Sequence, residues 1–330
     1  MAVSLSACLQ GTGQDDPIRL SGHTMGTDYM VKIPGIPAGL GREGLHARIK
    51  EILERINGRM STYEEDSELS LFNNTRTTDW VDVSEETALV VQEALRISRL
   101  TGGAFDITVG PLVNLWGFGP APQQGQLPGK DAIRAAMTTV GYHRLHLRDS
   151  PPALRKDQPA IQIDLSAIAK GYAVDAVAEY LDSVQVSSYL VEIGGELRAK
   201  GEKAERVPWK VAVERPVPEG RRVLRTLFLR NSAMATSGDY RNFFEKDGQR
   251  FSHTINPRTG KPITHNLASV TVLSASCMEA DAWTTGLMVL GPEEGYELAT
   301  REKLPALFVT RGANGFEQQA TAEFDRFLES

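Results

Sequence analysis

The chain has 330 residues, of which 41% are hydrophobic and 24% charged, which is an ordinary globular composition with ample material for a core. Its net charge is −6 and no block of lysine and arginine stands out, so the sequence lacks the electrostatic footprint of a nucleic-acid-binding protein. It contains no run of about 18 apolar residues that would predict a membrane span, and its two cysteines are too few for a disulfide framework or a four-ligand zinc site.

Residues 1–19 are predicted to form a lipoprotein-like N-terminus and a polar tether, ahead of one folded domain over 20–330. The sequence Leu5-Ser6-Ala7-Cys8 resembles a bacterial lipobox, whose cysteine is acylated and becomes the first residue of the mature chain. The seven residues before Cys8 are too few for a signal peptide, and so short a match can also arise by chance. The stretch up to Pro17 is rich in Gly, Gln, Thr and Asp, as expected of a tether. Stable anchoring needs more than one acyl chain, which a tri-acylated cysteine supplies.

The first half of the folded part mixes strand and helix patterns. Alternation of apolar residues predicts strands, a spacing of three to four predicts helices, and Gly and Pro mark breaks. In chain order we expect a strand over Leu20–Ile33, a helix over Leu45–Met60, a helix from Ser84 to Leu100, an exposed loop over Pro120–Gly129, and strands at His143–Leu147 and Ile161–Leu165.

The second half is richer in strands. In chain order we expect a helix over Ala167–Leu181, strands at Tyr189–Ile193, Trp209–Glu214, Val223–Leu229, Phe251–Ile255 and Ala268–Leu273, a helix over Glu279–Leu290, a strand at Ala306–Thr310, and a helical tail. Strands and helices come in runs without steady βαβ alternation, which favours an α+β fold with mainly antiparallel sheets and flanking helices.

Several common sites are missing from the sequence. No Gly-x-Gly-x-x-Gly directly follows a predicted strand, and the sequence contains no Walker A loop and no Gly-x-Ser-x-Gly elbow. The six histidines form no His-x-x-x-His pair, so a transition-metal site is not expected.

A first polar segment, Ile163–Tyr172, lies at a predicted junction between a strand and a helix. A carboxylate, an open carbonyl and the ammonium of Lys170 would converge at the helix start, which is a natural site for a polyphosphate. The alternative is structural: Asp164 or Ser166 caps the helix and Lys170 is solvated.

A second segment, Ala280–Gly286, places Asp281 and Thr285 at positions i and i+4 of a helix, so that both oxygens project from one face. A carboxylate with a hydroxyl suits Mg²⁺, which is usually held by few protein oxygens and the phosphates of its substrate. Alternatively, the threonine hydroxyl bonds to its own helix backbone.

Two further segments carry candidate residues. His253 precedes a turn of Asn256, Pro257 and Gly260 and is either a general base or a structural histidine. In Thr101–Thr108, two glycines would let a ligand approach the backbone closely, or they form a helix C-cap followed by a strand.

Together these segments resemble the ApbE-type FAD:protein FMN transferases. The resemblance covers about 20–310 in the family's order. The matching segments are GHTMGT from Gly22, STY from Ser61, GGAFDITVGPLVNLWGFG from Gly102, IDLSAIAKGYAVD from Ile163, LVEIGGELRAKG from Leu190, ATSGDYRNFF from Ala235, FSHTINPRTGKPI from Phe251 and MEADAWTTGLMVLG from Met278.

The resemblance implies a two-lobed single domain over 20–330 and a set of site residues. Mg²⁺ would lie on the Ala167 carbonyl, Asp281 and Thr285, and His253 would be the base. The FAD pocket would be lined by Met25, Tyr63, Ala104, Phe105, Asp106, Asp164, Lys170 and Ile255. The acceptor would be a threonine or serine in a short motif of a flavoprotein subunit, typically of a membrane redox complex. The family is periplasmic or membrane-anchored and often lipoprotein, which supports acylation at Cys8 and leaves Cys277 unpaired.

The implied reaction is attack of the acceptor hydroxyl on the flavin-side phosphorus of FAD, with AMP as leaving group. In such a reaction, positioning and electrostatic stabilisation contribute more to catalysis than covalent chemistry by the enzyme. Lys170 would offset part of the negative charge on the phosphates, and His253 would remove the hydroxyl proton. Two alternatives remain: water replaces the hydroxyl, giving a Mg²⁺-dependent FAD pyrophosphatase, or the chain is a flavin-binding lipoprotein without catalysis.

Overall fold

The computed structural model describes most of the chain. The described residues are 17–37, 39–120, 127–203, 207–217, 220, 222–240, 243–246 and 249–328. Cys8 and the predicted tether before Pro17 lie outside them, as do residues 121–126 of the predicted loop. No helix within the described ranges has the length and apolar character needed to cross a membrane.

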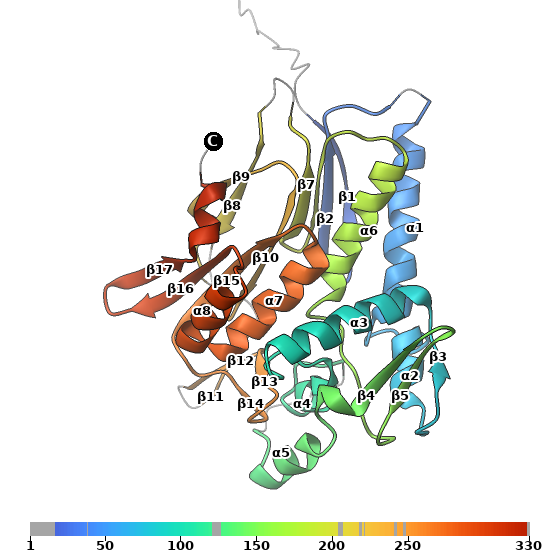
Figure 1. Ribbon diagram of the computed structural model, residues 1–330, viewed down its shortest axis with the longest axis vertical. Coiled ribbons are helices and arrows are strands. Elements are labelled where there is room, and N and C mark those ends of the chain that lie inside the picture. The colour runs from blue at the N-terminus through green and yellow to red at the C-terminus, as the bar shows by residue number, and fades with distance from the viewer. Residues whose placement is uncertain are drawn as a thin grey trace, which may run out of the picture.

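An eight-stranded antiparallel sheet forms the middle of the protein (Figure 1). Its order is β1-β2-β6-β7-β10-β15-β16-β17. The strands are β1 (Ile18–Thr24), β2 (Thr27–Ile33), β6 (Tyr189–Ile193), β7 (Glu196–Lys200), β10 (Ser232–Gly238), β15 (Leu267–Ser274), β16 (Ala306–Gly312) and β17 (Gly315–Ala320). All neighbouring strands run antiparallel, which confirms the predicted α+β class.

Both faces of this sheet are covered. Side chains alternate between faces along each strand, so Ala233 and Ala235 of β10 join the larger core while Met234 joins the smaller one. The larger core lies under helices, and the smaller core lies under the two-stranded ribbon of β8 (Trp209–Glu214) and β9 (Val223–Leu229).

Helices α1, α6 and α7 cover one face of the sheet, and α3 crosses below them (Figure 1). The helices are α1 (Arg42–Met60), α2 (Glu68–Asn74), α3 (Glu85–Leu100), α4 (Gly110–Leu115), α5 (Lys130–Met137), α6 (Ala169–Ser183), α7 (Cys277–Leu290) and α8 (Pro292–Arg301). The predicted start of α3 is confirmed, since the Ser84 side chain accepts a hydrogen bond from the backbone N–H of Thr87.

Small sheets and 3₁₀ turns complete the part that carries α4 and α5. They are β3 (Val81–Asp82), β4 (Leu145–Asp149) and β5 (Pro152–Lys156) in one sheet, the pair β11 (Phe243–Lys246) and β12 (Gln249–Ser252), the pair β13 (Ile255–Asn256) and β14 (Lys261–Pro262), and 3₁₀ turns at Ile107–Val109 and Tyr142–Arg144. A further 3₁₀ turn at Ala322–Phe327 packs against β9 and β16.

The strand predicted over Leu20–Ile33 is wrong as a single element. Met25 and Gly26 have φ angles of 49° and 69°, so they form a tight turn and the segment folds back as the β1–β2 hairpin.

The strand predicted over Ile161–Leu165 does not form. The Asn73 side chain donates to the carbonyl of Ile163 and accepts from its N–H, both at 2.8 Å, so a side-chain amide replaces the sheet partner. The predicted helical tail is also wrong in part, because residues after Gly315 first form β17.

Candidate functional site

A cavity of 1630 Å³ opens where the β1–β2 turn, the start of α6, the middle of α7 and the β12–β13 segment meet. Apart from Cys8, all residues predicted for the site line it. These are Met25, Tyr63, Ala104, Phe105, Asp106, Asp164, Ala167, Lys170, His253, Ile255, Asp281 and Thr285. The structure therefore brings together residues from six separate segments, although their chemical roles remain predictions.

A backbone carbonyl just before α6 accepts no helical hydrogen bond. The helix begins at Ala169 with Ile168 as its N-cap, so Ala167 lies outside it and the N–H of Gly171 is one of the first N–H groups, which have no acceptor within a helix. This N–H donates to Asp281 Oδ2 at 3.0 Å. Among the described residues, no backbone N–H donates to Ala167, so its carbonyl is available at the cavity.

Helices α6 and α7 approach closely enough to allow this bond because residue 171 is glycine. A Cβ at Gly171 would lie 2.4 Å from the carbonyl oxygen of Cys277 and 2.8 Å from Cβ of Asp281. Helix α6 does not begin with the predicted side-chain cap: its N-cap is Ile168, while Asp164 accepts from the N–H of Ser166 in the preceding turn.

Thr285 does not form the self-contained helix bond considered as the alternative. Its neighbour Thr284 does so, donating to the carbonyl of Asp281 at 2.8 Å. The Thr285 hydroxyl lies 3.2 Å from the hydroxyl of Ser237 on β10, which also lies 2.9 Å from that of Thr284. The Asp281 carboxylate and the Thr285 hydroxyl thus both line the cavity.

Lys170 forms an ion pair with a carboxylate that the sequence did not single out. Its Nζ lies 2.8 Å from Oε2 of Glu196, at the start of β7. Burial alone would lower the pKa of Lys170, but Asp281 and Glu196 outweigh burial and raise it above its usual value. Burial raises the pKa of Glu196 to about 7; Lys170 opposes this rise and Asp281 adds to it. Burial also raises the pKa of Asp281, against Lys170 and the Gly171 N–H.

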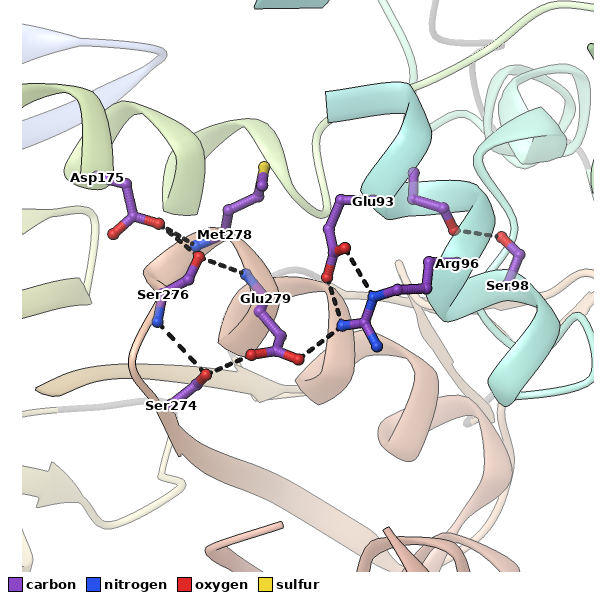
Figure 2. Close-up of polar contacts among 9 residues, drawn as sticks. Glu93, Arg96, Ser98, Asp175, Ser274, Ser276, Met278 and Glu279 are labelled. Atoms are coloured by element: carbon purple, nitrogen blue, oxygen red, sulfur yellow. Dashed lines mark hydrogen bonds and ion pairs between the residues drawn. The ribbon is translucent and has the colours of Figure 1, made fainter. Parts of the chain in front are cut away.

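A polar network anchors the start of α7, as Figure 2 shows. The carboxylate of Asp175 on α6 accepts from the N–H groups of Cys277 and Met278 at 3.0 and 2.9 Å. Glu279 accepts from Arg96 of α3 at 2.6 Å. A carboxylate at a helix N-terminus satisfies N–H groups that have no partner within the helix. The network therefore fixes the helix that carries Asp281.

His253 lies between β12 and β13 rather than inside the single strand predicted there. Ser252 and Thr254 are 4% and 9% exposed, whereas His253 is half-buried and lines the cavity. The N–H of Thr254 donates to the hydroxyl of Ser252, and the ring of Phe118 meets the imidazole edge-on at 6.3 Å. The local turn thus presents the histidine to the cavity while its neighbours pack inside.

The Thr101–Thr108 segment ends α3 with a bond from the Gly103 N–H to the Ser98 carbonyl, which is the helix C-cap considered as one alternative, although a 3₁₀ turn and not a strand follows it. Ala104–Ile107 line the cavity, whereas Gly102 and Gly103 are not among the lining residues. Arg258 donates to the carbonyls of Thr101 and Gly102, which ties this segment to the turn after His253.

Asp106 and Tyr63 differ greatly in their surroundings. The buried Asp106 carboxylate accepts from the N–H groups of Thr108 and Tyr142, both at 2.8 Å. Burial raises the pKa of Asp106, and these bonds oppose the rise. Tyr63 is 67% exposed at the cavity edge, where a large aromatic face can meet a planar ligand.

The described residues contain no group of three or more His, Cys, Asp or Glu side chains that could hold a metal ion. The predicted donors that line the cavity are instead one carboxylate, one hydroxyl and one carbonyl. Such a set of few oxygens fits Mg²⁺, which keeps further positions for water and phosphate, and does not fit zinc.

Comparison with known proteins places these features in a family. The ApbE family model matches residues 25–308. The FAD:protein FMN transferase of Vibrio cholerae serotype O1 is 44% identical over 329 residues, covering 99% of this chain and 98% of that protein. The protein of the same name from Escherichia coli K12 is 42% identical over 313 residues, covering 94% and 89%.

Solved structures agree with this placement. Flavin transferase ApbE from Vibrio cholerae superposes with a TM-score of 0.89 at 43% identity, covering 95% of this chain and 100% of that chain. The apo form of Pseudomonas stutzeri flavinyl transferase ApbE superposes with a TM-score of 0.87 at 39% identity, covering 96% and 98%.

Proposed function

The chain belongs to the ApbE family, and from that premise we propose that it works with Mg²⁺ held by Ala167, Asp281 and Thr285. It is an FAD:protein FMN transferase: FAD is its substrate and a flavoprotein is its acceptor. The metal, the individual roles of the residues, the class of acceptor and the cellular location are proposals.

The observation that carries the metal proposal is the bond from Gly171 to Asp281. This bond places Asp281 at the N-terminus of α6, two residues after Ala167, whose carbonyl accepts no backbone hydrogen bond among the described residues and keeps its lone pairs for another partner. The same bond holds one oxygen of Asp281 and leaves the other available. With the Thr285 hydroxyl at the same cavity, the donor set supports a hard cation beside a diphosphate.

Each of the proposed site residues has a separate role in the phosphoryl transfer step. The acceptor hydroxyl forms a bond to the flavin-side phosphorus, the bond to the AMP oxygen breaks, and AMP leaves with the electron pair. His253 takes the hydroxyl proton, and Lys170 offsets charge on the phosphate oxygens. When bound, Mg²⁺ supplies Lewis-acid stabilisation of the diphosphate and its leaving group. Tyr63 and Met25, at the cavity edge, orient the flavin ring.

The size of the cavity supports a protein acceptor. Pockets for one small ligand usually measure roughly 300–1,000 Å³, and the 1630 Å³ observed here exceeds that range. The additional space suits a segment of a second protein that brings a threonine or serine hydroxyl to FAD. We propose that this acceptor is a subunit of a membrane redox complex, and that the chain acts in the periplasm, held to a bacterial membrane by lipid on Cys8.

The decisive experiment incubates the protein with FAD, Mg²⁺ and a candidate acceptor subunit, and follows AMP release and a flavin-labelled acceptor band. Transfer gives both products, and both disappear when EDTA replaces Mg²⁺. AMP release with free FMN and no labelled band would make the protein an FAD pyrophosphatase. FAD binding with no AMP would make it a binding protein. Full labelling in EDTA would refute the metal proposal.

A further inference from the structure

We propose that Glu196 is a positioning residue that keeps the Lys170 ammonium away from Asp281, so that the Asp281 carboxylate stays available to a divalent cation. This inference rests on the proposed metal site and extends it to a residue of β7 outside the predicted donor set.

Glu196 is held rigidly at the cavity wall. It is 4% exposed and follows the tight turn of Gly194 and Gly195, whose φ angles of 63° and 109° favour glycine. The Gly194 N–H donates to the carbonyl of Asp28 at 3.0 Å, and a Cβ at Gly194 would lie 2.9 Å from Cγ2 of Thr27. These contacts fix the backbone at the start of β7, from which the Glu196 carboxylate reaches Lys170.

Two carboxylates, those of Asp281 and Glu196, could form an ion pair with Lys170. Its ammonium interacts electrostatically with both Asp281 and Glu196. Within the described part of the chain, its ion pair of 2.8 Å is formed with Glu196 and not with Asp281. Lys170 leaves the first turn of α6 beside Gly171, whose N–H reaches Asp281, so Asp281 is the obvious second partner.

Charge balance explains why a second carboxylate matters. The three side chains sum to one negative charge when all are ionised. A buried charge needs a partner, and attraction between charges is stronger inside a protein than in water. Without the Glu196 charge, the ammonium would pair with Asp281 and compete with any cation there. With that charge present, Glu196 neutralises Lys170 and the charge of Asp281 remains for the metal.

The first test is Glu196→Gln, which removes the charge and keeps the shape. Melting temperature and FAD fluorescence quenching are followed against Mg²⁺ concentration in wild type and variant. We expect the Mg²⁺ concentration for half-saturation to rise about tenfold or more, which corresponds to about 1.4 kcal/mol or more. Glu192→Gln is the matched control, because it removes the same charge from the same cavity without touching the Lys170 ion pair. Its half-saturation should equal that of wild type.

The second test repeats Glu196→Gln in a Lys170→Met background. If Glu196 acts only through Lys170, the two Lys170→Met proteins should have the same Mg²⁺ half-saturation. An equal shift in both backgrounds would make Glu196 a metal ligand or a source of general field and would overturn the proposal. So would a Glu196→Gln variant that melts lower with unchanged half-saturation, since that is a structural role. A wild type whose FAD binding and melting ignore Mg²⁺ would overturn the metal site itself.

Discussion

The Asp281 carboxylate has two roles in the proposed site. Its Oδ2 accepts a hydrogen bond from the Gly171 N–H, and the residue also lines the cavity in which the cation is proposed to bind. Asp281→Asn keeps the shape and an oxygen for Gly171 but loses the charged ligand. We expect Mg²⁺-dependent AMP release to be abolished while the circular dichroism spectrum stays that of a folded protein. Full turnover of Asp281→Asn at low-millimolar Mg²⁺ would remove Asp281 from the metal site.

We propose that His253 takes the acceptor proton. His253→Ala should lower the rate of FMN transfer by about 10²- to 10⁴-fold, because a general base acts in the transition state. FAD affinity should change little. The control is His146→Ala, whose imidazole pairs with Asp157 at 2.7 Å away from the cavity and should leave the rate unchanged. A rate loss that follows a loss of stability would mean that His253 is structural.

At the level of residues, local sequence patterns indicated candidate site residues better than they indicated contacts between distant elements. The sequence indicated Asp281 and Thr285 because i, i+4 spacing on a helix is local information. The sequence patterns did not indicate Glu196 and Gly171, because the roles of these residues depend on contacts between α6, α7 and β7. No local pattern contains such contacts. The two glycines before Glu196 were the available signal, since such a pair marks a turn needing positive φ.

Among the elements, the contact between α6 and α7 decides the geometry of the site. Gly171→Ala would place a Cβ 2.4 Å from a carbonyl oxygen of α7 and should destabilise the protein by about 1–3 kcal/mol. It should also weaken Mg²⁺ binding, because the helices must separate. Stability is measured by urea unfolding and Mg²⁺ binding by thermal shift.

Gly58 in α1 offers the opposite case and serves as the control. A Cβ there meets nothing within 4 Å, so Gly58→Ala should stabilise the protein by about 0.5–1 kcal/mol through helix propensity and a less flexible unfolded chain. Equal effects of the two substitutions would show that the helix contact is not tight.

Sequence patterns predicted elements well where the pattern was local and continuous. Strands at Tyr189–Ile193, Trp209–Glu214 and Val223–Leu229 form with the predicted bounds. The segment Ile161–Leu165 has the apolar alternation of a strand, but the distant Asn73 takes over its backbone groups. Strand β10 went unnoticed because Ser232–Gly238 is rich in small and polar residues, and only its two sheet neighbours make it a strand.

The stability of the whole molecule should depend on pH through Lys156, whose side chain is buried and donates to the carbonyls of Phe72 and Thr75. Burial lowers the pKa of Lys156 from 10.5 to about 8. Between these values the unfolded chain carries a proton that the folded chain has lost. Stability relative to Lys156→Met should therefore rise with pH across this window, by at most about 1.4 kcal/mol per pH unit.

Urea unfolding of wild type and Lys156→Met between pH 8 and 10 measures the contribution of Lys156 alone, because all other titratable groups are the same in the two proteins. If the difference in free energy of unfolding between wild type and Lys156→Met is constant with pH, the buried ammonium keeps its usual pKa. If this difference falls as pH rises, the surrounding carbonyls favour the charged form of Lys156.

We propose that Cys8 anchors the whole molecule to a membrane. Expressed in a bacterium with an export signal ahead of it, the chain should be acylated at Cys8 and recovered with membranes, while Cys8→Ser should be recovered in the soluble fraction. Intact mass spectrometry distinguishes the two. Cys277 is fully buried and should stay unmodified in both. An unmodified Cys8 in the wild type would refute the anchor and leave the catalytic proposals intact.

The order of strands in the central sheet has a consequence for synthesis of the chain. The hairpin of β1 and β2 contains Met25, yet its next neighbour is β6 at Tyr189–Ile193. A growing polypeptide must hold this hairpin with one edge exposed until residue 193 has left the ribosome. Pairings between such distant segments form slowly, and exposed strand edges invite aggregation. The cavity wall built by the first strands is thus completed late, and we expect nascent chains stopped before β6 to be prone to aggregation.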